Sequence, residues 1–420
     1  MEPPPLQSEQ RRPRQTLASS GSVATVDEIQ GSVSPCHRAD DDSKDVETSG
    51  DSIPYLPEDI WRHIHFLMPM DAAAHAACLS HAFLSSWRST VRSLQLDCCI
   101  FHPMLELGPL RSLTRLTLRV VHITGEELEC LLSNSLALEH LDLNDCKELT
   151  FLKIPSVLLQ LSYLSVIGCW DLQVIQSKGS SLSSLTLIGE VSKLSLGETS
   201  QMKFLSMRCE NVVCYARANL PSIVPNLETL ELGSWAEVNT PMLPTKFLNL
   251  KHLAIHLNGE TFSPSYDYFS MVSFLDASPS LETWWLDVSL EDMKHESIFG
   301  GSSHLRQLPE RHHDCLKNFE VIGFSSAKGL VELTCCIVKS AVSLKQLTLD
   351  TLYGGGRCFG GNDSDRCGKI CCSVSKAMLE EAFRGVAAIR KYIEYEVPPT
   401  ARLIVLEPCP SCHTSTDYGM

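Results

Sequence analysis

The chain has 420 residues, of which 44% are hydrophobic, and its formal net charge is −15. This length exceeds what one ordinary core accommodates, so we expect two structural units or one elongated array. The negative charge argues against non-specific binding to nucleic acid or to an anionic membrane, because both require a basic surface. The richest apolar stretch, 151–170, is interrupted by polar residues and proline, so we expect no membrane-spanning helix.

The N-terminal segment, residues 1–52, is rich in Pro, Ser, Gly and Asp. Such a composition buries too little apolar surface to offset the loss of chain entropy, and it predicts a disordered tail. The first residues lack the apolar core of a secretory signal, and the eighteen cysteines are scattered along the chain. We therefore expect reduced thiols and a location in the cytoplasm, the nucleus or both.

Residues 53–90 have the pattern of three short helices. Pro57 suits the first position of a helix, and Pro69 ends the apolar stripe that follows it. Asp71 can cap a second, alanine-rich helix, and a third helix is expected near Trp87. The apolar positions of this segment are Leu56, Ile60, Ile64, Leu67, Cys78, Leu79, Phe83 and Trp87.

Over residues 91–352 one motif, apolar-x-x-apolar-x-apolar, occurs eleven times. The first seven intervals between successive motifs are 20 to 25 residues long, and the last three are 28 to 35. This period is typical of leucine-rich repeats, in which each motif supplies one strand of a curved parallel sheet. The motifs begin at residues 91, 113, 138, 161, 182, 202, 227, 250, 281, 316 and 344.

Side chains alternate along a strand, so in the motif at 138–143 Leu141 and Leu143 face the core and Asp142 faces out. One repeat cannot cover its own apolar face, and neighbouring repeats must therefore stack. The predicted fold is an α/β leucine-rich-repeat solenoid with helices or loops on its convex side. The Asn/Cys position of the repeat, whose side chain bonds the turn backbone, is occupied by Cys99, Cys146, Cys169 and Asn258.

The segments between the strands and after the last motif contain patterns typical of helices and loops. Thr124-x-x-Glu127 is a capping box ahead of leucines at helical spacing, and 268–275 is apolar enough for a second convex helix. The glycine-rich segment 353–374 predicts a flexible loop. Residues 375–413 are then expected to form a helix and a strand that cap the array.

The helical segment at 53–90 resembles an F-box, through its Leu-Pro pair, its first-helix stripe and its later Cys-Leu-Ser, Phe and Trp positions. Members of that family dock onto a Skp-family linker, which joins them to cullin and RING subunits. Asp71-Ala72 and His75 depart from the family pattern, which often has Arg-Asp and Arg there. The resemblance implies that the linker contacts Leu56, Pro57, Ile60, Ile64, Leu67, Cys78, Leu79, Phe83 and Trp87.

The C-terminal region, 375–413, resembles the FBD segment of grass F-box/leucine-rich-repeat proteins. Together the two resemblances imply a substrate-recognition subunit of a Skp–cullin–F-box (SCF) ubiquitin ligase, which binds a protein target through its repeats and is not itself an enzyme. Two alternatives stay open: a scaffold in which the helices are only a cap, and a receptor that needs a small molecule to hold its target. No nucleic acid, membrane or cofactor is expected as a partner.

Two clusters of chemically versatile residues are candidate sites. The spacing of the C-terminal cysteines suits zinc only loosely, and plain reduced thiols are favoured. Residues 311–314, Arg-His-His-Asp, suggest a metal or acid–base site, but no nucleophile accompanies them and a solvated loop is expected. The cysteines concerned are Cys358, Cys367, Cys371, Cys372, Cys409 and Cys412.

A tryptophan pair, Trp284-Trp285, falls within one predicted strand. Because side chains alternate, we expect one indole in the core, whereas the other either faces the concave surface as an anchor for the target or packs under a loop. Both residues are therefore candidates for target binding. The central outward positions of the other strands show no single sign of charge, so they indicate no class of partner.

Overall fold

The computed structural model of the chain describes residues 91–101, 108–178, 181–190, 193–257, 266–288, 295–300, 304–306, 312–352 and 374–408. All of them lie within one compact unit, Tyr55–Met420. The expected tail at 1–52, the helical segment at 53–90 and nearly all of the glycine-rich segment at 353–374 lie outside the described residues.

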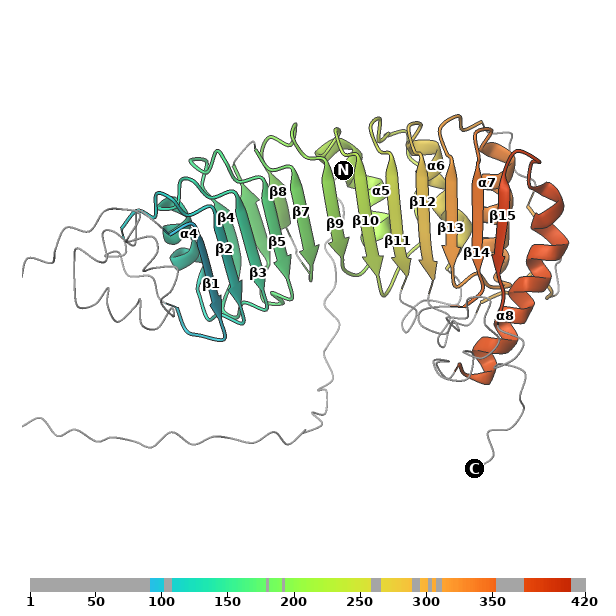
Figure 1. Cartoon of the computed structure of the whole chain (residues 1–420), viewed down its shortest axis with the longest axis horizontal. Coiled ribbons are helices and arrows are strands. Elements are labelled where there is room, and N and C mark those ends of the chain that lie inside the picture. Colours follow the sequence, from blue (N-terminus) through green and yellow to red (C-terminus); the bar gives the residue numbers. More distant parts are fainter. Residues whose placement is uncertain are drawn as a thin grey trace, which may run out of the picture. The chain divides into compact units, whose positions relative to one another are not determined.

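A parallel sheet of twelve strands is the largest element of the described structure (Figure 1). All eleven repeated motifs coincide with strands of this sheet, and each strand pairs with the strand of the next motif, which confirms the leucine-rich-repeat fold. The strands are β1 (Ser93–Asp97), β2 (Arg115–Arg119), β3 (His140–Asn144), β5 (Tyr163–Ile167), β7 (Ser184–Ile188), β9 (Phe204–Arg208), β10 (Thr229–Ser234), β11 (His252–Leu257), β12 (Thr283–Val288), β13 (Asn318–Ile322), β14 (Gln346–Asp350) and β15 (Arg402–Leu406).

Several strands of the large sheet lead into a tight turn whose first residue has a positive φ. Gly168 and Gly189 occupy this position after β5 and β7 with φ values of 68° and 141°. Glycine adopts this conformation without a steric cost, whereas a β-branched residue there is strained. Val120, which follows β2, has a φ of 53°. The turn after β2 therefore stores strain that the glycine-containing turns avoid.

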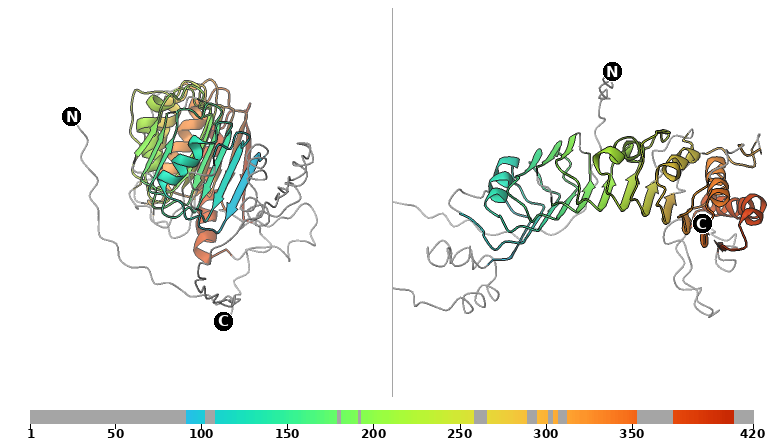
Figure 2. Two further views of the ribbon diagram at one scale, coloured as in Figure 1. Left: turned by 90° about the vertical axis from the view of Figure 1, so that its left-hand side faces the viewer. Right: turned by 90° about the horizontal axis from the view of Figure 1, so that it is seen from above.

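Helices cover one face of the large sheet, as the two views of Figure 2 show. The first follows the expected capping box: Thr124 Oγ1 accepts from the Glu127 amide at 3.3 Å, and the Thr124 amide donates to Glu127 Oε2 at 2.8 Å. The second expected convex helix is also present, split into a 3₁₀ turn and a short α-helix. These helices are α4 (Gly125–Ser133), α5 (Val212–Ile223), η3 (Tyr268–Met271), α6 (Val272–Ala277) and α7 (Lys328–Ser340).

Three of the connections contain a short strand, a feature that the sequence did not predict. The strands β4 (Phe151–Ile154), β6 (Val174–Ser177) and β8 (Lys193–Leu196) pair in parallel as a second sheet. Each occurs between two successive strands of the large sheet. The regular short intervals in this part of the chain leave no room for a long helix, and a short strand covers the core with fewer residues.

The C-terminal segment continues the large sheet. After α8 (Lys376–Ala388) the chain forms a π-helical turn, η5 (Ile389–Ile393), and a 3₁₀ turn, η6 (Glu394–Glu396). It then returns as β15, which pairs in parallel with β14. The expected helix and strand are therefore present, and the strand is the twelfth member of the sheet.

A half-buried carboxylate, that of Glu381, attaches α8 to the repeats. Glu381 Oε1 accepts from the Ser326 amide at 2.7 Å and lies 3.2 Å from His295 Nε2. Burial raises the pKa of this carboxyl, but the hydrogen bonds from His295 and Ser326 together outweigh burial and lower it. The ionised carboxylate therefore ties the C-terminal helix to the segment that precedes α7.

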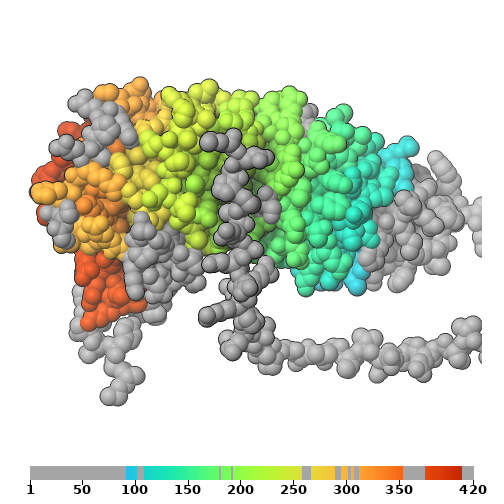
Figure 3. Space-filling model, turned by 180° about the vertical axis from the view of Figure 1, so that it is seen from behind, coloured from blue at the N-terminus to red at the C-terminus, as the bar shows by residue number. Residues whose placement is uncertain are grey.

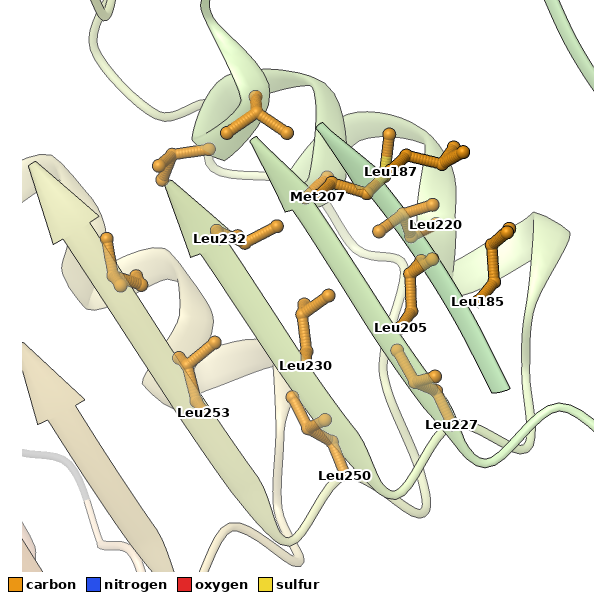
Figure 4. Close-up of a cluster of buried hydrophobic side chains, with 14 of the residues drawn as sticks. Leu185, Leu187, Leu205, Met207, Leu220, Leu227, Leu230, Leu232, Leu250 and Leu253 are labelled. Atoms are coloured by element: carbon orange, nitrogen blue, oxygen red, sulfur yellow. The ribbon is translucent and has the colours of Figure 1, made fainter. Parts of the chain in front are cut away.

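The hydrophobic core lies between the large sheet and its helices. Figure 4 shows leucines of successive strands in rows, with Leu220 of α5 close to Leu187 and Leu205 in this view. Leu205, Leu230 and Leu220 have no solvent exposure. Each fully buried leucine contributes roughly 1.5–3 kcal/mol, so the repeated rows hold neighbouring strands together. Figure 3 shows the helix-bearing face, where the repeats follow one another in sequence order from blue to red.

Two cysteines bond the turns as the repeat pattern predicts. The thiol of Cys146 lies 3.6 Å from the Leu118 carbonyl oxygen, and that of Cys169 lies 3.9 Å from the Leu143 carbonyl oxygen. A hydrogen bond to Cys169 and burial both raise the pKa of the Cys146 thiol. These thiols are structural. Cys99 is half-buried, and Asn258 lies outside the described residues.

One buried arginine joins three segments on the helix-bearing side. Arg217 of α5 is 1% exposed. Its Nε donates to the Ser273 carbonyl at 3.1 Å, its Nη1 donates to Thr245 Oγ1 at 3.1 Å, and its Nη2 donates to the Leu243 carbonyl. The guanidinium therefore links α5 to α6 and to the loop between β10 and β11.

Candidate protein-binding face

The large sheet has one face that the helices leave uncovered, which we call the open face. It displays the residues that alternate with the buried leucines, and the strand register aligns them in three rows. The middle row consists of Gln95, Thr117, Asp142, Ser165, Thr186, Ser206, Glu231, Ala254, Trp285, Glu320, Thr348 and Ile404.

The two adjacent tryptophans of β12 lie on opposite faces of the sheet. Trp284 is 1% exposed, and its ring centroid lies 5.5 Å from that of Phe319 in the core. A target cannot reach Trp284, so its assignment as a target-binding residue is wrong. Trp285 is half-buried on the open face, where its indole is accessible. Alternation along the strand accounts for both positions.

Trp285 belongs to a polar group that we call the Trp285 cluster, made up of Glu231, His256, Trp285, Asp287 and Glu320. The His256 ring meets the indole edge-on, with centroids 4.5 Å apart and an interplanar angle of 77°. His256 Nδ1 lies 3.3 Å from Asp287 Oδ2. Asp287 Oδ1 is buried and has no hydrogen-bond partner among the described residues. Such an acceptor is costly unless a donor reaches it.

The middle of the open face has a different character. Tyr163, Ile167, Ile188 and Phe204 surround a row of small hydroxyl residues on β5, β7 and β9, and all four are half-buried. We call these four residues the central patch. Because the hydroxyl row does not rise above the sheet, the four larger side chains are available to a partner.

Charge is unevenly distributed along the open face. The fifteen open-face positions of β10 to β14 include four carboxylates, of which Asp350 is buried, and no lysine or arginine, although Arg208 of β9 extends over Gly233 of β10. Strands β1 to β9 instead display three arginines and two carboxylates. The charged residues of the middle row, Asp142, Glu231 and Glu320, are all acidic, so the expectation that the outward positions show no single sign of charge is wrong. Together with Asp287 of a flanking row, Glu231 and Glu320 give an acidic region over β10 to β14. Its accessible carboxylates are Glu231, Asp287 and Glu320, which are half-buried.

A ladder of ion pairs lies at the start of these strands. Lys203 Nζ and Lys251 Nζ lie 2.8 and 2.9 Å from the two carboxylate oxygens of Glu228. The hydrogen bonds and charges of the two lysines lower the pKa of Glu228 to about 2. Lys317 Nζ lies 2.6 Å from Glu282 Oε2 in the same row. With three lysines and two glutamates the ladder carries a net charge of +1, so it offsets only part of the acidic region beside it.

The candidate metal sites do not form in the described part of the chain. No group of three or more His, Cys, Asp or Glu residues able to hold a metal occurs among the described residues. His313 is 6% exposed, its Nε2 lies 2.8 Å from the Ser278 carbonyl oxygen, and its Nδ1 accepts from the Leu316 amide at 3.2 Å. The expectation of a solvated loop is therefore wrong for His313, which is a buried turn residue.

The remaining candidate residues cannot be placed. The nine residues of the F-box-like segment all precede residue 91 and lie outside the described residues, as do the six cysteines weighed for zinc. No helix in the described ranges is long and apolar enough to cross a membrane.

Comparison with known proteins identifies the family. Residues 66–410 match the model of the At1g61320/AtMIF1 LRR domain. No curated protein matches the chain. A leucine-rich-repeat domain indicates protein binding, which agrees with an open face that displays aromatic, apolar and charged side chains. The matched segment covers well over half of the chain, and the protein therefore belongs to the At1g61320/AtMIF1 leucine-rich-repeat family.

Proposed function

We propose that this protein is the substrate-recognition subunit of an SCF ubiquitin ligase. The F-box-like segment at 53–90 binds a Skp-family linker, and the open face of the sheet binds a protein target. The observation that supports this proposal most directly is the order of the two parts. A segment with the F-box pattern directly precedes a repeat sheet whose first strand begins at Ser93.

The chemistry required of this chain is positioning. In such a complex the linker and cullin hold the ubiquitin-loaded partner, and the open face holds the target beside it. Holding two reactants together raises their effective concentration, which alone can supply a large rate gain. The chain needs no nucleophile or general base for this role. A location in the cytoplasm or the nucleus is proposed with it, because the linker and its partners act there.

Binding to a purified Skp-family linker tests the proposal. The full chain should bind the linker, and Leu56→Asp combined with Pro57→Asp should abolish binding because a charge would replace the apolar anchor. Leu248→Asp is the matched control, since Leu248 is 61% exposed within the repeats and lies far from the segment in sequence. Both variants should keep the circular dichroism spectrum of the unaltered protein.

A non-ligase scaffold is the second candidate, and one observation favours it. The family match begins at residue 66 and leaves the Leu-Pro pair and the first-helix stripe up to Ile64 outside. The same binding experiment separates the two functions. Absence of linker binding by the unaltered chain, or binding that survives the double substitution, would leave the scaffold as the better description.

A further inference from the structure

We propose that the Trp285 cluster binds an arginine or lysine side chain of a basic segment in the target protein. This inference rests on the proposed function only in taking the open face as the surface that meets the target. It assigns a chemical class to the partner.

The first support is the arrangement of side chains across three neighbouring strands. Glu231 of β10 pairs in register with Ala254 of β11, which pairs in register with Trp285 of β12. Adjacent strands lie about 4.8 Å apart, so Glu231 and Trp285 are separated by roughly 10 Å with only a methyl group between them. A carboxylate and an indole thus flank a small residue at a separation that suits a long cationic side chain.

The second support is the chemistry of the surrounding groups. Glu320 of β13 is in register with Trp285 on its other side, so carboxylates lie on both flanks of the indole. The face of tryptophan attracts cations, and arginine also stacks on it. Each feature selects for positive charge.

The third support comes from the region around the cluster. Strands β10 to β14 have no lysine or arginine of their own on the open face, although Arg208 of β9 extends over Gly233 of β10 and the neighbouring ion-pair ladder has three lysines for two glutamates. An acidic surface of this kind attracts a basic partner and repels nucleic acid. A bare metal ion is a poor fit, since the described residues form no group that could hold one. A basic segment of a protein therefore suits the surface best.

The test is a titration of the full-length protein with short synthetic peptides that contain either paired arginines or paired glutamines in the same glycine–serine background. The arginine peptide should bind and change the tryptophan fluorescence, and its affinity should fall with added salt. Trp285→Leu should weaken binding about fivefold. Glu231→Gln combined with Glu320→Gln should weaken it about tenfold or more.

Two matched variants control for general effects. Trp170→Leu removes an indole that is 61% exposed elsewhere in the chain, and Asp142→Asn removes a middle-row carboxylate on β3. Both should retain binding within about twofold, and all variants should keep the thermal unfolding midpoint of the unaltered protein.

Equal binding of the glutamine and arginine peptides would overturn the inference. So would absence of binding to the arginine peptide, or an equal loss in the Trp285→Leu and Trp170→Leu variants. Linker binding is measured separately on the same protein. A chain that binds the linker but not the arginine peptide would contradict only this inference, and the reverse result would contradict only the ligase role.

Discussion

Replacing Arg217 with methionine removes three hydrogen bonds that join α5 to two other segments. The guanidinium donates to the Ser273 carbonyl, to Thr245 Oγ1 and to the Leu243 carbonyl. A hydrogen bond from a charged donor contributes about 1.5–3 kcal/mol, so three contribute roughly 6 kcal/mol before burial of the charge is considered. Removing that charge relieves a desolvation penalty of several kcal/mol. The expected net loss in the free energy of unfolding is about 3 kcal/mol.

Urea denaturation followed by circular dichroism measures this loss. Arg111→Met is the matched control, because Arg111 is exposed, and it should change the free energy of unfolding by less than about 0.5 kcal/mol. Arg217→Lys keeps the charge but cannot reach all three acceptors, so its loss should approach that of the methionine variant. If Arg217→Met were as stable as the control, the three bonds would not hold these segments together.

Three further predictions concern single positions in the repeats. Val120→Gly should stabilise the protein by about 0.5–1 kcal/mol in the same denaturation assay, because glycine removes strain at a positive φ that exceeds its entropic cost. Glu228 has a pKa lowered to about 2 by its two lysine partners, so its contribution to stability is present above about pH 4.3 and is lost as the pH falls towards 2. Thermal unfolding of Glu228→Gln should accordingly differ from that of the unaltered protein near neutral pH and coincide with it at pH 2. Exposed Cys98 should be alkylated before buried Cys146, as measured by mass spectrometry of the labelled peptides.

Each of these predictions has an outcome that contradicts it. A Val120→Gly variant less stable than the unaltered protein would mean that the turn is relaxed. A difference between Glu228→Gln and the unaltered chain that persists unchanged at pH 2 would exclude the ionised carboxylate as its source. Equal alkylation rates for the two cysteines would indicate that the turn around Cys146 opens readily.

Much of the fold was predictable because the repeat is a local pattern. The position of a strand at each motif follows from the alternation of apolar residues within that motif. The start of α4 likewise follows from the capping box formed by Thr124 and Glu127, which are three residues apart. Alternation also separates Trp284 from Trp285. The positions of Cys146 and Cys169 in their turns follow from the repeat in the same way. In each case the neighbours that decide the conformation are adjacent in sequence.

Features that depend on distant partners were not predictable in this way. Arg217 and Ser273 are 56 residues apart, and no local pattern marks the bond between them. The His313 ring bonds the nearby Leu316 amide and also the carbonyl of Ser278, which is 35 residues earlier in the chain. The burial of His313 depends on this distant contact and was therefore not predicted. The acidic region was predictable in part, because Glu231 and Glu320 occupy the central outward positions of their motifs, whereas Asp287 lies in a flanking row.

The regular spacing of the strands also fixes the distances between side chains that a segment crossing the open face would meet. Glu231 and Glu320 lie on β10 and β13, three strand steps apart, which corresponds to about 14 Å at the level of the backbone. An extended segment that crosses the strands at right angles advances about 3.4 Å per residue, so four residues span the same length. Side chains four apart in an extended segment point the same way. A target that placed one basic residue beside each glutamate would therefore carry them at positions i and i+4.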